Sequence, residues 1–133
     1  MSRRVVGIDP GLTRCGIAVV DVSANRKVSF VSVDTLRSST DLDLPARISV
    51  LAQAIEKVLD EYKPDLLAIE RVFSQQNVST VMGTAQISGV IMLLAERRSI
   101  PVQMHTPTEV KAAVTGSGRA AKAQVGQMVA QIL

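Results

Sequence analysis

Short apolar runs separated by turn-forming residues fill the first part of the chain, a pattern typical of β-strands. The runs cover residues 5–9, 16–20 and 28–33. Pro10-Gly11 separates the first two runs, and the polar residues 23–27 separate the second from the third. Because these connections are short, we expect the three strands to form an antiparallel meander.

Apolar positions then recur every three or four residues from residue 44 to residue 62, which predicts a helix with one buried stripe. Pro45 fits the first turn of that helix. Residues 66–69 are apolar without interruption, whereas a strand with one face in solvent would alternate. Since they follow a helix, they predict a buried strand that lies beside the first strand and runs parallel to it.

A second long helix is predicted over residues 78–98, and a last strand over residues 101–105. The helix carries a face of small side chains, which permits close packing against the sheet or a second subunit. These side chains are Gly83, Ala85, Ser88 and Gly89.

Residues 106–109, Thr-Pro-Thr-Glu, match a helix-capping box with proline at the first helical position. A short helix is therefore predicted over residues 107–114, followed by a break at residues 116–118 and another helix from about residue 120. The apolar stripe of this last helix continues to Leu133 without a capping signal. We therefore expect a single domain that stops within a helix or just after it.

Composition narrows the class of protein. A chain of 133 residues that is 47% hydrophobic can form one domain with a buried core. It has no long uncharged apolar run and one cysteine, Cys15, so we expect a cytoplasmic protein with neither a membrane span nor disulfides. Cys15 itself is expected to be a small buried residue.

The net charge of +3 is unevenly distributed. Residues 1–70 carry 9 Lys and Arg against 10 Asp and Glu, whereas residues 71–133 carry 6 against 2. A basic second half suggests a polyanionic partner, with ordinary solvated basic side chains as the alternative.

Two acidic residues end two of the buried strands. Asp9 follows the first apolar run, and Glu70 follows residues 66–69. Strand ends of open sheets border the crevice where ligands bind, so the pair suggests a site for metal ions. Taken singly, Asp9 has the alternative of a turn residue and Glu70 that of an ion-pair partner for Arg71. After Glu109 the chain has no Asp or Glu, although hydrolytic metal sites normally use more than two carboxylates.

The predicted strand and helix order is the layout of the ribonuclease H-like nucleases, and three segments resemble bacterial Holliday junction resolvases of the RuvC family. The resemblance covers essentially the whole chain. The segments are Val6-Gly7-Ile8-Asp9-Pro10-Gly11 with Gly16, Ala68-Ile69-Glu70-Arg71-Val72-Phe73, and Glu109-Val110-Lys111 through Gly116-Ser117-Gly118 to Lys122-Ala123-Gln124-Val125.

The resemblance implies both a fold and a catalytic metal site. The fold is an α/β ribonuclease H-like mixed sheet, with strands 1–3 antiparallel, strands 4 and 5 parallel, and helices on both faces. The centre would use Asp9 and Glu70 as catalytic metal ligands for two Mg²⁺ ions, which Mn²⁺ can replace. The family's remaining ligands lie on a later C-terminal helix that this chain does not reach, so we expect weak cleavage or none. His105, the only histidine, is expected to be structural.

Several later residues are candidates for DNA contact. Phe73 is a lone aromatic among polar residues, and in the family the aromatic at this position is thought to wedge into the unstacked junction centre; its alternative is a loop anchor. Lys111 and Lys122 match the family's backbone-binding lysines, and Arg119 could join them. The backbone N–H groups of residues Gly116, Ser117 and Gly118 could turn toward a phosphate.

By resemblance, the chain is a dimeric endodeoxyribonuclease that resolves four-way junction DNA, with the RuvAB branch-migration complex as its partner. Two alternatives remain. The absent carboxylates favour a junction-binding module without cleavage. The segment from Gly7 to Thr13 also resembles the first phosphate loop of actin and sugar-kinase ATP-binding domains, although the further loops of those proteins are missing here.

Overall fold

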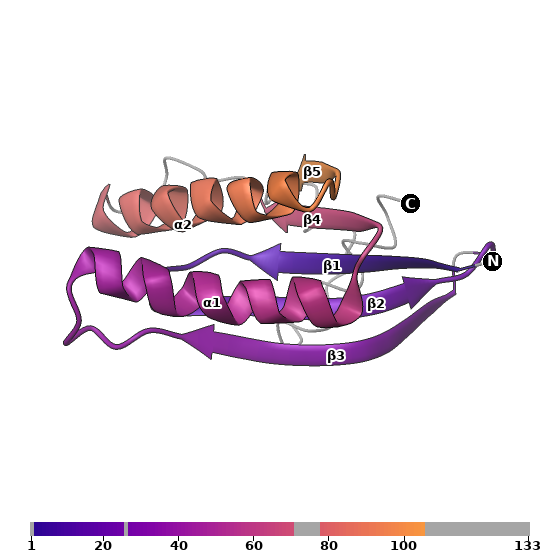
Figure 1. Cartoon of the computed structure of the whole chain (residues 1–133), viewed down its shortest axis with the longest axis horizontal. Helices are drawn as coiled ribbons and strands as arrows, with labels where there is room; N and C mark the ends of the chain where they lie inside the picture. The colour runs from indigo at the N-terminus through magenta and orange to yellow at the C-terminus, as the bar shows by residue number, and fades with distance from the viewer. Residues whose placement is uncertain (1, 26, 71–77, 106–133) are drawn as a thin grey trace.

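The computed structural model describes residues 2–25, 27–70 and 78–105, which form five strands and two helices in the predicted order (Figure 1). The capping box and the helices expected after it lie outside the described residues. The elements are β1 (Arg3–Asp9), β2 (Arg14–Val22), β3 (Val28–Arg37), α1 (Leu44–Tyr62), β4 (Leu66–Glu70), α2 (Val78–Arg97) and β5 (Val102–His105).

The strands form one mixed sheet in the order β3-β2-β1-β4-β5. β2 runs antiparallel to β1 and β3, whereas β4 runs parallel to β1 and β5. The antiparallel meander and the buried parallel strand beside β1 are therefore confirmed. Since β1, β4 and β5 are parallel, their carboxyl ends meet at one edge of the sheet.

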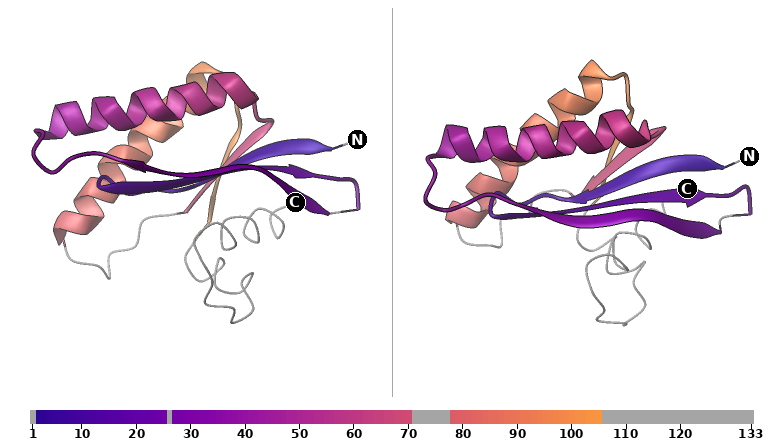
Figure 2. Two further views of the ribbon diagram at one scale, coloured as in Figure 1. Left: turned by 90° about the horizontal axis from the view of Figure 1, so that it is seen from below. Right: turned by 60° about the horizontal axis from the view of Figure 1, so that its bottom comes forward.

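Both described helices pack on the same face of the sheet (Figure 2). Alternate strand residues such as Ile8, Ile17 and Ile69 enter a core shared with α1 and α2. The intervening residues form a second buried cluster on the opposite face, with Val5, Ala18, Val20, Val22, Leu66 and Ala68. Helices on both faces were predicted, but the helices predicted within residues 107–133 lie outside the described part of the chain, so a helix on this second face stays a prediction.

Helix α1 has the predicted bounds because local signals fix both of its ends. The Asp43 side chain accepts a hydrogen bond from the Ala46 backbone N–H at 3.1 Å, and proline occupies the first turn. Lys63 ends the helix in the left-handed conformation, with φ 47°, and its N–H bonds to the Leu59 carbonyl at 3.0 Å.

The small side chains of α2 do not share one face, so that prediction is wrong. Gly83 and Ser88 are buried on the core side, whereas Ala85 and Gly89 are exposed. Residues 83, 85, 88 and 89 span too much of the helical circumference to lie together. α2 also ends at Arg97, one residue earlier than predicted.

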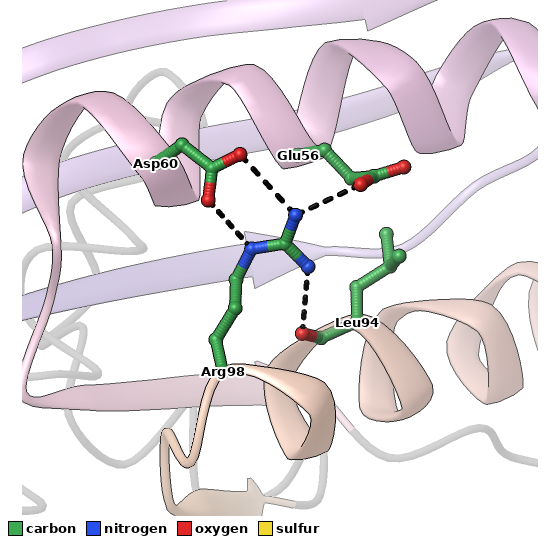
Figure 3. A network of polar contacts seen from close by, with 4 residues as sticks. All are labelled: Glu56, Asp60, Leu94 and Arg98. Atoms are coloured by element: carbon green, nitrogen blue, oxygen red, sulfur yellow. Dashed lines mark hydrogen bonds and ion pairs between the residues drawn. The ribbon is translucent and has the colours of Figure 1, made fainter.

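Arg98 joins the carboxyl-terminal parts of the two helices (Figure 3). Its Nε lies 2.7 Å from Asp60 Oδ1, and its Nη2 lies 2.8 Å from Glu56 Oε2. Nη1 donates to the Leu94 carbonyl oxygen at 3.1 Å. The two acids raise the pKa of Arg98, and hydrogen bonding to Arg98 lowers the pKa of Asp60.

A second ion pair lies where β1 begins. The Arg4 guanidinium bonds both carboxylate oxygens of Asp21, at 2.9 and 3.1 Å, and lies 5.9 Å from the centre of the Tyr62 ring. The Arg4 backbone N–H bonds Asp65 Oδ2 at 2.8 Å. Arg4 thus joins the start of β1 to the end of β2 through opposite charges, and it contacts the end of α1 through the Tyr62 ring and the Tyr62 carbonyl.

Candidate metal centre

Asp9 and Glu70 lie side by side at the carboxyl ends of neighbouring parallel strands. Ile8 pairs with Ile69 in the β1–β4 register, and the next residue of each strand is an acid. Because Ile8 and Ile69 point into the helix-side core, alternation places both acids on the opposite face of the sheet. We call this the carboxylate face. The proximity predicted for the two carboxylates is confirmed.

The two carboxyl groups interact strongly. Burial of the Glu70 side chain, the negative charge of Asp9 and a hydrogen bond between the two groups raise the pKa of Glu70 to about 7. Two acids this close cannot both ionise easily, because their charges repel. Glu70 therefore holds its proton to much higher pH than an isolated glutamate, unless a cation compensates the second negative charge.

The chemistry of this pair fits a hard divalent cation. Such ions prefer carboxylate oxygens, and a double positive charge would relieve the repulsion that now raises the pKa of Glu70. Within the described residues, no group of three or more Asp, Glu, His or Cys side chains could hold a metal ion. Asp9 and Glu70 thus fit part of a ligand set.

His105 ends β5 and is the register partner of Glu70. The backbone therefore brings three ionisable residues, Asp9, Glu70 and His105, to the ends of three adjacent strands. The structural role expected for His105 depends on its side chain, and it stays a prediction.

The turn after Asp9 is held by residues that the sequence analysis missed. Arg47 Nε donates to Ser38 Oγ at 3.1 Å, and Arg47 Nη2 donates to Thr13 Oγ1 at 2.9 Å. Ser38 Oγ donates to the Leu12 carbonyl at 2.6 Å. Arg47 was detectable, because it lies three residues after Leu44 and four before Leu51, on the apolar stripe of α1.

Two glycines shape the same end of the sheet. A Cβ atom at Gly11 would collide with the carbonyl oxygen of Arg14, so the tight turn requires glycine there. Gly16 lies opposite Asp9 in the register, and a Cβ at Gly16 would be 3.6 Å from the Asp9 Cβ. Gly16 therefore leaves the surface beside Asp9 without a side chain.

A cavity of about 450 Å³ lies beside this turn, on the side of the helices. Its lining combines the turn with the beginnings of α1 and α2, and a Cβ at Gly83 would lie 3.3 Å from the Leu12 Cβ. Neither Asp9 nor Glu70 lines this cavity. The lining residues are Gly11, Leu12, Thr13, Arg14, Arg47, Thr80, Gly83 and Thr84.

The candidate DNA contacts all fall outside the described residues. These candidates are Phe73, Lys111, Gly116, Ser117, Gly118, Arg119 and Lys122. Arg71, the alternative partner of Glu70, also lies outside them. Their roles stay predictions.

Two expectations from composition can be compared with the fold. Cys15 is fully buried in the helix-side core, and burial raises the pKa of its thiol to about 11, as expected for a structural cysteine. Across the described ranges, neither helix combines the length and apolar character needed to cross a bilayer.

Comparison with known proteins supports the resemblance. The family model described as crossover junction endodeoxyribonuclease RuvC matches residues 5–133. A protein of that name from Paenarthrobacter aurescens is 58% identical over 133 residues, which cover 100% of this chain and 70% of the relative. A Streptomyces avermitilis protein of the same name is 59% identical over 130 residues, which cover 98% of this chain and 74% of the relative.

Among solved structures, the chain is similar to Thermus thermophilus RuvC in complex with a Holliday junction substrate. The TM-score is 0.80 at 29% identity, and the match covers 98% of this chain and 79% of the other. The ribonuclease H-like fold class is confirmed, and the resolvase is favoured over the ATP-binding alternative.

Proposed function

The chain belongs to the RuvC family of crossover junction endodeoxyribonucleases, and from this premise we propose that it binds four-way junction DNA and hydrolyses its phosphodiester bonds. The family is one of metal-dependent nucleases that act in DNA recombination and repair. The observation that carries the proposal is the pairing of Asp9 with Glu70 at the strand ends, where the negative charge of Asp9 helps to raise the pKa of Glu70. A site that must hold cations and phosphate together has this charge pattern.

Asp9 and Glu70 would hold Mg²⁺, with Mn²⁺ as a substitute, and two ions per site are expected. When bound, such ions supply charge stabilisation at the phosphate and lower the pKa of a bound water. The proton on Glu70 competes with the cation, because the same carboxylate oxygens bind both. Metal binding should therefore strengthen as the pH rises through about 7.

We assign DNA contacts to the later residues by family resemblance. Phe73 would stack in the unpaired junction centre, and Lys111, Lys122 and Arg119 would bind backbone phosphates. The N–H groups of residues 116–118 would add a phosphate contact.

A homodimer suits a substrate with twofold symmetry. The exposed side of α2 offers a surface for it, with Met82 54% and Leu93 48% exposed and Ala85 and Gly89 between them. These four residues follow helical spacing, and nothing lies within 4 Å of a Cβ built at Gly89. The RuvAB complex as partner and the cytoplasm as location rest on the family resemblance and on composition.

The proposal is tested by nicking of a labelled four-way junction with protein in excess, so that slow cleavage is still measured. We expect only slow Mg²⁺-dependent nicking of the junction, in keeping with the weak cleavage expected from the sequence, and no nicking of a linear duplex of the same sequence. Asp9→Asn should abolish the junction nicking, whereas Asp41→Asn, at an exposed acid outside the site, should not.

Two outcomes would count against the proposal. Cleavage by Asp9→Asn at the wild-type rate would show that the carboxylate pair takes no part in hydrolysis. Tight junction binding with no Mg²⁺-dependent nicking would favour the junction-binding module without cleavage.

A further inference from the structure

Arg14 and Arg37 lie directly opposite each other on β2 and β3. Both are exposed, and neither forms an ion pair within the described residues. Like charges directly opposite each other on neighbouring strands destabilise a sheet. The pair therefore has no evident structural benefit and presents two guanidinium groups together.

Both arginines belong to the carboxylate face by strand alternation, and Arg14, at the start of β2, also contributes to the cavity beside the turn. The neighbours of Arg14 point toward the helices, since Thr13 accepts a bond from Arg47 and Cys15 is in the helix-side core. The neighbours of Arg37 do the same, since Leu36 packs on that core and Ser38 also bonds Arg47. Strand alternation then places Arg14 and Arg37 on the opposite face, with Asp9 and Glu70.

The register sets the separation between the arginines and the carboxylates. Asp9 pairs with Gly16, and Gly16 pairs with Thr35. Arg14 is two residues from Gly16 along β2, so its Cα lies about 8 Å from that of Asp9, roughly two base-pair rises of duplex DNA. Among the described strand residues, Gly16 and Thr35 are the register positions between Asp9 and the arginines, and Gly16 adds no side chain.

Charge on this face is segregated. The other acids of the described strands are Asp21 and Asp34. Asp21 lies two residues after Val19 of the helix-side core, and Asp34 is the register partner of Ile17 of that core. Strand alternation therefore places both acids on the helix side. No acid of these strands thus faces the arginines except at the candidate metal centre. Arginine is also the side chain best suited to bidentate phosphate recognition.

We propose that Arg14 and Arg37 bind one backbone phosphate of the junction strand that enters the Asp9–Glu70 centre. This inference rests on the proposed function, because it concerns the same DNA substrate. The two arginines position the strand and take no part in bond cleavage. Their contact is to the backbone and is independent of base sequence.

The test is junction binding by the 133-residue chain at 50–200 mM salt with EDTA, which prevents cleavage. In the double variant Arg14→Ala with Arg37→Ala we expect roughly tenfold weaker binding and a salt slope reduced by about one. Arg3→Ala is the matched control, because Arg3 is exposed on the same face at the other end of β1. It should leave the salt slope unchanged.

Thermal unfolding separates positioning from a structural role. Removing one of two like charges should keep the melting temperature of Arg37→Ala unchanged or raise it by about 1–3 °C. A lower melting temperature with weaker binding would indicate a structural role and overturn the proposal.

The remaining outcomes are distinguishable. This inference alone would be overturned if the double variant bound the junction with wild-type affinity and an unchanged salt slope. It would also be overturned if Arg3→Ala lost as much affinity as the double variant. Failure of the wild-type chain to bind a junction at 50 mM salt would overturn both this inference and the proposed function.

Discussion

The two ends of the sheet differ in how their charges are arranged. At the end where β1, β4 and β5 begin, arginines form ion pairs with acids. At the end where these strands finish, residues of like charge lie next to each other. Arg4 pairs with Asp21, and Arg98 pairs with Glu56 and Asp60, at what we call the ion-paired end. At the opposite end, the carboxylate end, Asp9 adjoins Glu70 and Arg14 adjoins Arg37.

The difference indicates that one end of the sheet contributes to stability and the other to ligand binding. Opposite charges at the ion-paired end stabilise the folded chain by themselves, although exposed pairs contribute little. Like charges at the carboxylate end destabilise it, and a ligand of the opposite sign can compensate them. A metal cation beside the acids and a phosphate beside the arginines would supply that compensation, which is why substrate and metal binding should stabilise this end.

The largest expected effect concerns Glu70→Gln. The pKa of Glu70 is raised, so the folded state binds more protons than the unfolded state between pH 4.5 and about 7. Stability from this group is full below pH 4.5 and is lost as the pH rises through about 7. Allowing for solvent screening of a half-buried group, the loss at pH 8 is about 2 kcal/mol.

Urea unfolding of the wild type and Glu70→Gln at pH 5 and pH 8 measures this loss. The wild type should lose about 2 kcal/mol relative to the variant between the two pH values. An equal difference between the proteins at both pH values would show that Asp9 and Glu70 do not repel each other as described.

The next effect concerns Ser38, which holds the turn at the carboxylate end without ion pairs. Ser38→Ala removes the bond to the Leu12 carbonyl and leaves Arg47 without one acceptor, so unfolding should become easier by about 1.5 kcal/mol. Ser29→Ala, at an exposed strand position, should change stability by less than about 0.5 kcal/mol. If Ser38→Ala and Ser29→Ala changed the free energy of unfolding in urea equally, the hydrogen bonds of Ser38 would not stabilise the turn.

A smaller effect is expected at the ion-paired end from Arg98→Ala. It removes the contacts to Glu56, Asp60 and the Leu94 carbonyl, all partly exposed to solvent, and should lower the melting temperature by roughly 2–4 °C. Arg97→Ala, one residue earlier and without an ion pair in the described residues, is the control. A shift of the same size in Arg97→Ala would assign the effect to helix propensity.

The smallest effect expected is the change in stability at acid pH that comes from the ion pair between Asp60 and Arg98. Hydrogen bonding to Arg98 lowers the pKa of Asp60, so its contribution is present above the pKa of unfolded Asp and is lost as the pH falls through the lower, folded value. Asp60→Asn should therefore unfold with a shallower pH dependence than the wild type below pH 4. Identical acid unfolding curves would contradict the pairing.

Sequence patterns predicted these features unevenly. The bounds of α1 follow from Asp43 and Lys63, which act within one turn of the helix, and the strand that ends in Glu70 is apolar throughout. β3 continues to Arg37, four residues past its predicted end at residue 33. Backbone pairing extends the strand there, although three of the four added residues, Asp34, Thr35 and Arg37, are polar and exposed.

The candidate site shows the same division. Two acids at the ends of two buried strands predicted their proximity, because adjacent parallel strands end together. The pairing of Arg14 with Arg37 depends on the register of β2 and β3, which includes an irregularity between Val19 and Val20. Local sequence does not specify such a register, so the cationic half of the carboxylate end emerged only from the fold.

The central claim is that Asp9 and Glu70 form a divalent metal centre, and Mn²⁺ binding followed by the loss of its free-ion EPR signal tests it most directly. The wild-type chain should bind Mn²⁺ more tightly at pH 8 than at pH 6, because the raised pKa of Glu70 keeps it protonated at the lower pH. Asp9→Asn and Glu70→Gln should lose this binding, while Asp41→Asn retains it. Binding that is independent of pH, or equal in Asp9→Asn and the wild type, would contradict the claim.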